Sequence, residues 1–221
     1  MYHKQLYRIA TLLLCIMILA ANTVINSSGT LETLNQSISS PPIYIGNEDE
    51  NKMALMCNVY WGTEFIEPML EIFKEKGIKI TFFVGGSWVD DNEEMLKKIV
   101  EAGHELGNHG YYHYNHSGLS KERSMKNIQD AHNIVKEITG VAPPSGDFNN
   151  QTVSCAEELG YKTIMWTIDT IDWRDKDVDL IVSRVMNKKK NGALVLMHPT
   201  AQTVAALPKI IDGLTENGYT L

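Results

Sequence analysis

Short apolar runs of strand length alternate with segments of helical periodicity from Met53 onward, and this alternation constrains the fold most. The predicted strands are 53–58, 78–84, a short run before His109, 161–168 and 193–197. The predicted helices are 64–76, 92–102, 120–139, 152–159, 178–190 and 203–217. Apolar strands separated by helices are typical of a parallel sheet covered by helices. We therefore predict an α/β fold with about seven parallel strands, a (β/α) barrel, with an open doubly wound sheet as the alternative.

The first 21 residues have the layout of a secretory signal. Lys4 and Arg8 precede an unbroken run of apolar and small residues at 9–21. A basic start followed by such a run is typical of a signal peptide. The run is short for a bilayer-spanning helix, which needs about 20 residues. We expect residues 1–21 to be a signal peptide or a retained membrane anchor that contacts the membrane.

Residues 22–52 are rich in Ser, Thr, Asn and Gly and have little periodicity. This composition is typical of a flexible linker. We therefore predict a linker at 22–52 and a single folded domain at 53–221. The protein is expected to be exported, either extracellular or anchored to the outer face of the membrane.

Charge and cysteine content narrow the possible partners. The formal net charge is −7, which argues against nucleic acid as a partner. The three cysteines, Cys15, Cys57 and Cys155, provide neither an even set for a disulfide framework nor a cysteine zinc site. We expect Cys57 and Cys155 to be small core residues, and the protein to be a monomer.

Unusual polar residues fall directly after the predicted strands. Asn58 ends the first strand, His109 and His113 follow the third, and Asp172 and His198 follow the last two. In β/α barrels the reactive side chains come from these carboxyl ends, so we expect the residues to converge. Two histidines four residues apart on a helical turn can reach one metal ion. A lone histidine after a strand is more often a core residue. Coincidence is a poor explanation, however, when polar residues follow several predicted strands in the same way.

The polar residues belong to an ordered set of short motifs. The set is Asn58-Val-Tyr-Trp-Gly62, Thr81-Phe-Phe-Val84, Gly103-His-Glu-Leu-Gly-Asn-His109, His113, Pro143-Pro-Ser-Gly146, Asp169-Thr-Ile-Asp-Trp173 and Leu196-Met-His198. It resembles the polysaccharide deacetylase domain, carbohydrate esterase family four, and is closest to the sporulation-associated branch. The similarity runs from about Met53 to the C-terminus. The resemblance implies a distorted (β/α) barrel.

The resemblance also implies a chemistry. Family members use a divalent metal, usually zinc, to remove N-acetyl groups from amino-sugar polysaccharide such as peptidoglycan or chitin-like glycan. His109 and His113 match the metal-binding histidines, His198 matches the general acid, and Asp172 matches the carboxylate that orients it. A metal lowers the pKa of bound water to about 7, and an amine leaves poorly unless it receives a proton.

Two tryptophans and one loop are candidate substrate-binding elements. We expect Trp61 and Trp173 to form walls of the pocket or to stack on sugar faces, with core packing as the alternative for each. The turn-rich loop that carries Pro143, Ser145 and Gly146 matches a family motif beside the site. We expect these three residues to contribute to substrate binding.

The first motif departs from the family pattern. Family members normally carry Thr-Phe-Asp-Asp-Gly, in which the first Asp is the catalytic base and the second is the third metal ligand. Here Asn58 stands where the base should be, and Val59 and Tyr60 occupy the neighbourhood of the ligand. Ala142 replaces the arginine that pairs with the base. Asp and Arg are lost together, as expected because either charge alone would be costly to bury.

Three hypotheses follow from this departure. The first is a working deacetylase with a rearranged site, in which Asn58 is a weak ligand or Asp147 or Asp169 supplies the ligand or base. The second is a glycan-binding pseudoenzyme, and the third is a structural protein that keeps only the barrel. The retained His198 and Asp172 favour the first hypothesis over the third. The sequence favours hydrolysis, and the pseudoenzyme is the alternative; they differ in whether a third oxygen ligand reaches the ion.

Overall fold

A computed structural model of the 221-residue chain describes residues 41–114, 118–140, 145–146 and 150–221. The expected signal segment and most of the expected linker lie outside these residues. So do three residues of the predicted site, Ala142, Pro143 and Asp147. No helix in the described ranges is both long and apolar enough to span a bilayer.

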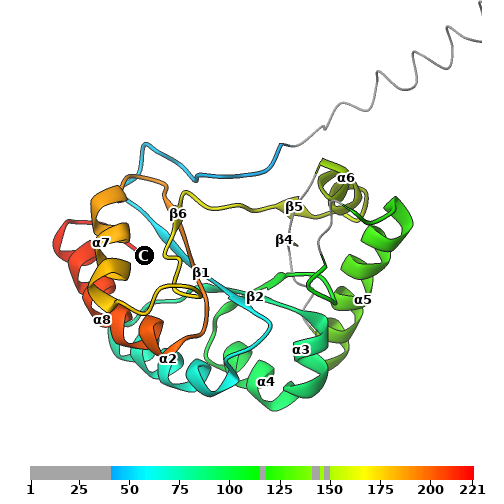
Figure 1. The fold of residues 1–221 in the computed structure, drawn as a ribbon, viewed down its shortest axis with the longest axis horizontal. Coiled ribbons are helices and arrows are strands. Elements are labelled where there is room, and N and C mark those ends of the chain that lie inside the picture. Colours follow the sequence, from blue (N-terminus) through cyan, green and yellow to red (C-terminus); the bar gives the residue numbers. More distant parts are fainter. Residues whose placement is uncertain (1–40, 115–117, 141–144, 147–149) are drawn as a thin grey trace, which may run out of the picture. The chain divides into compact units, whose positions relative to one another are not determined.

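A parallel sheet forms the centre of the fold (Figure 1). Its strands, in spatial order, are β3 (Glu105–Asn108), β2 (Thr81–Val84), β1 (Ala54–Val59), β7 (Leu194–Met197) and β6 (Ile168–Asp169). A second parallel pair consists of β4 (Ser145–Gly146) and β5 (Lys162–Thr163). All these neighbours pair in parallel, which confirms the predicted α/β fold. The strands form two hydrogen-bonded sheets, as expected for a distorted barrel rather than a closed ring.

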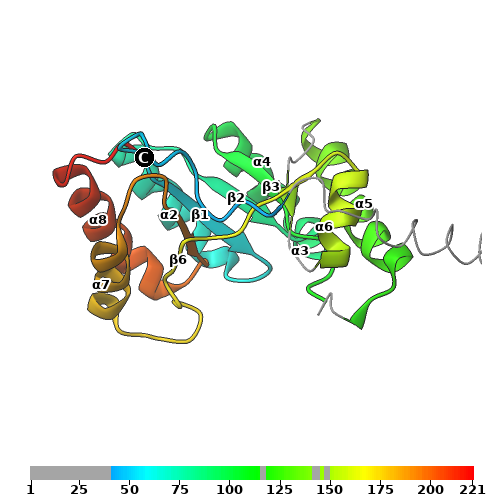
Figure 2. The same cartoon turned by 90° about the horizontal axis from the view of Figure 1, so that it is seen from above.

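Helices cover the sheet and extend beyond both of its ends (Figures 1 and 2). They are α2 (Thr63–Lys76), α3 (Gly86–Asp91), α4 (Glu93–Glu101), α5 (Lys121–Thr139), α6 (Asn150–Glu158), α7 (Val178–Lys188) and α8 (Ala201–Glu216). In both views α7 and α8 lie at the β6 end, and α5 and α6 lie at the opposite end. Ser120 caps α5 as a side-chain acceptor for the Arg123 amide, 3.4 Å away. The short α3 was not predicted, because six residues give too little periodicity.

The central strand β1 is buried between β2 and β7. Leu55, Cys57 and Val59 point into the main core, and Cys57 pairs with Phe82 on one side and Met197 on the other. Burial, with a smaller contribution from the charge of a nearby aspartate, raises the pKa of the Cys57 thiol. Both Cys57 and Cys155 are buried and unbridged, so they are core residues as predicted.

The structure also differs from the predicted elements at residues 161–168 and at residues 43–45. The predicted strand at 161–168 is broken into β5 and β6, because the chain between them pairs elsewhere. Ile164 forms a parallel bridge with Ile43, and Ala193 forms an antiparallel bridge with Ile45. Residues 43 and 45 were expected in the linker, so the folded unit begins ahead of Met53.

Candidate functional site

The carboxyl ends of the central strands border a pocket of about 520 Å³. Its lining residues are Asn58, Tyr60, Trp61, His109, His113, Trp166, Asp169, Trp173, Leu196 and His198. The structure therefore brings together the predicted residues that follow β1, β3, β6 and β7. Trp166, Tyr60 and Leu196 also line the pocket, and the sequence did not identify them as functional residues.

The loop after β3 holds the two histidines without a helix. Gly110 has a φ of 80°, so the predicted helical turn between His109 and His113 is wrong. The two imidazole rings nevertheless lie near each other, with centroids 5.4 Å apart. His109 is 6% exposed because it directly follows the buried strand, whereas His113 is exposed.

Amide side chains hold this histidine loop in place. The side-chain oxygen of Asn108 accepts a hydrogen bond from the Gly110 amide, at 2.8 Å. Asn127 of α5 accepts from Tyr111 through its backbone oxygen and from Tyr112 through its side chain, both at 2.9 Å. Asn108 and Asn127 are both buried, so these bonds form away from water and fix the loop.

The residues around the two histidines do not fit a catalytic zinc site. Such a site normally has three protein ligands. The described residues contain no group of three or more His, Cys, Asp or Glu side chains that could hold a metal ion. Val59 is fully buried in the core, and the adjacent Asn58 offers only an amide. Asp169 lines the pocket, but one of its oxygens accepts a hydrogen bond from the Ile171 amide at 2.8 Å.

A buried carboxylate organises the opposite side of the pocket. Asp172 is 0% exposed, and its Oδ1 lies 2.8 Å from Nδ1 of His198. Its Oδ2 accepts hydrogen bonds from the His198 amide at 2.7 Å and from the Thr203 hydroxyl at 2.5 Å. Three hydrogen bonds therefore orient the carboxylate and fix the imidazole beside the pocket. The predicted pairing of Asp172 with His198 is present, and the acid role of His198 stays a prediction.

The backbone of the loop after β6 is strained at Ile171, directly before Asp172 and Trp173. Ile171 has a φ of 55°, which is the left-handed region that a β-branched residue rarely adopts. The Thr170 hydroxyl donates to the Leu196 carbonyl at 2.9 Å, and Arg184 donates to the Thr170 carbonyl at 2.7 Å. These bonds hold the strained backbone so that Asp172 points inward and Trp173 points outward. Strain of this kind is concentrated at functional sites.

Aromatic side chains form the walls of the pocket. Trp61 stacks on the His198 ring with centroids 5.9 Å apart and an interplanar angle of 4°. Trp61 is 45% exposed and Trp173 is 57% exposed, which excludes core packing for either. Trp166 lies where the predicted strand is broken, between β5 and β6. An aromatic residue in an apolar run is usually a core residue, so no local pattern indicates that Trp166 lines the pocket.

The predicted substrate loop is only partly described. Ser145 and Gly146 form β4, which pairs with Lys162 and Thr163 of β5. Pro143 lies outside the described residues. The contribution of these three residues to substrate binding stays a prediction.

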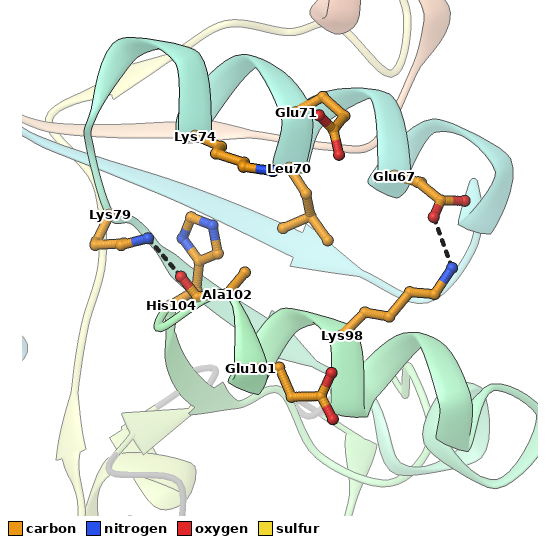
Figure 3. Close-up of a pocket in the computed structure, with 9 residues that line it drawn as sticks. All are labelled: Glu67, Leu70, Glu71, Lys74, Lys79, Lys98, Glu101, Ala102 and His104. Carbon is orange, nitrogen blue, oxygen red and sulfur yellow. Dashed lines mark hydrogen bonds and ion pairs between the residues drawn. The ribbon is translucent and has the colours of Figure 1, made fainter.

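A second cavity, of about 450 Å³, lies between α2 and α4, away from these strand ends (Figure 3). Both signs of charge line it, and the pair of Lys98 with Glu67 spans it at 2.6 Å. His104 is 7% exposed at its wall, and its Nδ1 accepts a hydrogen bond from the Ile80 amide at 3.1 Å. Burial and the nearby positive charge of Lys79 lower the pKa of His104 to about 4. His104 is therefore a neutral structural residue.

We expect His104→Asn to weaken the acid sensitivity of the fold. The pKa of His104 is about 4 in the folded protein and 6.5 in its ordinary state. At a pH between these two values, His104 is neutral in the folded protein and protonated in the unfolded chain. Stability is therefore lost as the pH falls through this range, by up to about 3 kcal/mol. Asn keeps an acceptor for the Ile80 amide but does not titrate. Urea unfolding at pH 7 and pH 4.5 should show a smaller difference in the variant; an equal difference would contradict this account.

Comparisons with known proteins agree with this fold. The family model for polysaccharide deacetylase matches residues 46–164. The peptidoglycan-N-acetylglucosamine deacetylase of Bacillus cereus is 35% identical over 165 residues, covering 70% of this chain and 78% of that enzyme. The uncharacterized protein YlxY of Bacillus subtilis is 39% identical over 191 residues, covering 84% of this chain. The chain spans 60% of the length of YlxY.

Solved structures show the same similarity. A CE4 family pseudoenzyme from Bacillus anthracis has a TM-score of 0.80 and 38% identity, covering 82% of this chain and 66% of that chain. A mutant of that pseudoenzyme, described as having restored enzymatic activity, has a TM-score of 0.80 and 37% identity. This second match covers 82% of this chain and 69% of the mutant.

Proposed function

We propose that this chain, which belongs to the polysaccharide deacetylase family, binds N-acetylated cell-wall glycan without hydrolysing it. One observation carries the proposal. The pocket keeps its aromatic walls, but Asn58 and Tyr60 are the side chains that line it next to the histidines. Neither can serve as a carboxylate base or as a carboxylate ligand.

The loss of hydrolysis follows from the chemistry of these two positions. A general base must accept a proton near neutral pH, and the amide of Asn58 has no useful basicity. Two imidazoles hold zinc less well than the three protein ligands of a catalytic site. The similar pseudoenzyme from Bacillus anthracis supports this proposal, because it is a protein of the same family and of similar fold that is described as lacking enzymatic activity.

The aromatic walls support a glycan as the ligand. Trp61, Trp166 and Trp173 all line the pocket. Tryptophan combines a large apolar face with one polar group, which suits the apolar face of a sugar ring. Among the relatives, the Bacillus cereus enzyme is a peptidoglycan-N-acetylglucosamine deacetylase, and PdaC of Bacillus subtilis is a peptidoglycan-N-acetylmuramic acid deacetylase. We therefore propose N-acetylated peptidoglycan as the ligand. The expected signal segment at 1–21 would bring the domain to that polymer.

A working deacetylase is the second candidate, favoured by the intact pair of Asp172 and His198. A histidine fixed by a buried carboxylate suits the protonation of a leaving amine, and glycan binding alone does not require it. Catalysis would further require a third metal ligand and a base. Asp169, or Asp147 outside the described residues, would have to supply them. The two candidates differ in one observable, the release of acetate.

A sedimentation assay tests glycan binding directly. The full-length protein should bind insoluble peptidoglycan that carries its N-acetyl groups, with and without a chelator. It should bind chemically de-N-acetylated peptidoglycan more weakly, since the pocket would then face charged ammonium groups instead of acetamides. No binding to either polymer, or equal binding to both, would contradict the proposed function.

A further inference from the structure

Tyr60 stands beside both histidines, directly after β1. Its ring centroid lies 5.0 Å from that of His109 and 4.9 Å from that of His113. The ring of His113 meets it edge-on, at an interplanar angle of 79°. Tyr60 therefore contacts the two side chains that match the metal-binding residues of the family.

The hydroxyl group of Tyr60 also binds the backbone of the histidine loop. Its oxygen lies 2.7 Å from the carbonyl oxygen of His109 and 2.8 Å from that of Gly110, so its single hydrogen is shared between these two acceptors. These two carbonyls lie at the left-handed turn between the histidines, where Gly110 has a φ of 80°. One side chain thus fixes both the backbone of the turn and the rings on either side of it.

The neighbouring backbone is shaped to accept this side chain. A Cβ atom at Gly85, which follows β2, would lie 2.1 Å from Cε1 of Tyr60. A Cβ atom at Gly110 would lie 3.6 Å from the Tyr60 hydroxyl oxygen and 2.5 Å from the amide nitrogen of Asn127. The tyrosine ring therefore occupies space that a side chain on Gly85 would close. This fit indicates a built position rather than an aromatic residue that happens to lie in a pocket.

The direction of the strand explains why position 60 matters. Side chains alternate along a strand, so Asn58 and Tyr60 face the pocket and Val59 faces the core. Position 60 is therefore the place from which a side chain reaches both imidazoles. We propose that Tyr60, together with the buried Asn108 and Asn127, holds the histidine loop from this position, so that the pocket forms without a metal ion and His109 and His113 act as wall residues.

Where an ion holds a site together, removing the ion loosens the site. If the histidine loop is held without an ion, removing or adding metal should leave the loop unchanged. In the full-length protein, a chelator should change amide hydrogen exchange across residues 108–114 by less than about twofold. Adding zinc should likewise slow the hydrogen exchange of these amides by less than about twofold. Tyr60→Phe keeps the ring but removes the hydroxyl, and should speed their exchange about fivefold, the factor for one hydrogen bond of ordinary net strength.

Tyr44→Phe is the matched control, because it removes a hydroxyl from an exposed tyrosine that does not line the pocket. It should leave the exchange of residues 108–114 unchanged. Stoichiometric zinc that slows exchange in the wild type, or unchanged exchange in Tyr60→Phe, would overturn the proposal. The inference shares with the proposed function only the premise of a metal-free pocket. Since the assay contains no glycan, failure to bind peptidoglycan would leave this inference standing.

Discussion

Asp172→Ala is expected to lower the free energy of unfolding by about 3–5 kcal/mol. The carboxylate is fully buried and accepts three hydrogen bonds, two from His198 and one from Thr203. Alanine would remove the acceptor shared by the His198 amide, the His198 ring and the Thr203 hydroxyl, and would add a cavity beside the core. Urea unfolding at neutral pH measures the loss.

Asp179→Ala is the matched control for this prediction. Asp179 forms an ion pair with Lys209 at 2.8 Å, but its side chain is 84% exposed. Exposed ion pairs contribute about 0–1 kcal/mol, so the control should remain close to the wild type. A loss below about 1 kcal/mol in Asp172→Ala would show that the buried carboxylate does not organise this side of the pocket.

Trp173→Ala is expected to weaken binding to N-acetylated peptidoglycan fragments about 30-fold, the equivalent of about 2 kcal/mol for a well-placed aromatic contact. Trp173 is 57% exposed at the end of a hydrogen-bonded loop, so its ring is available to a ligand and contributes little to the core. The free energy of unfolding should therefore change little. Calorimetric titration with a soluble peptidoglycan fragment measures the affinity.

Tyr44→Ala supplies the control for the tryptophan. It removes an aromatic side chain of similar exposure, 48%, that does not line the pocket. Its affinity for the fragment should equal that of the wild type. Equal losses in the two variants, or no loss in Trp173→Ala, would place the glycan elsewhere on the protein.

The sequence predicted the fold well because its signals are local. Continuous apolar runs separated by helical segments lead to a parallel sheet, and parallel strands align their carboxyl ends on one edge. Asn58, His109 and His198 therefore converge on one pocket without any knowledge of the loops. The position of Asp172 beneath His198 follows from the same arrangement, because β6 and β7 are neighbours in the sheet.

The details that decide the chemistry depend on loop geometry and were not predictable from local patterns. A spacing of four residues predicted a helical turn between His109 and His113, but a left-handed glycine replaces it. The sequence did not show whether Val59 or Tyr60 faces the histidines, since that depends on where β1 ends. Trp166 reaches the pocket only because residue 164 pairs with the N-terminal segment and breaks the predicted strand.

Acetate release is the most direct test of the claim that the protein binds glycan without hydrolysing it. The full-length protein is incubated with N-acetylated peptidoglycan fragments and added zinc, beside His198→Ala. We predict the same background release from both proteins, because the wild type has no carboxylate base at position 58. Release by the wild type that falls by about 10²–10⁴-fold in His198→Ala would contradict the account and establish a working deacetylase.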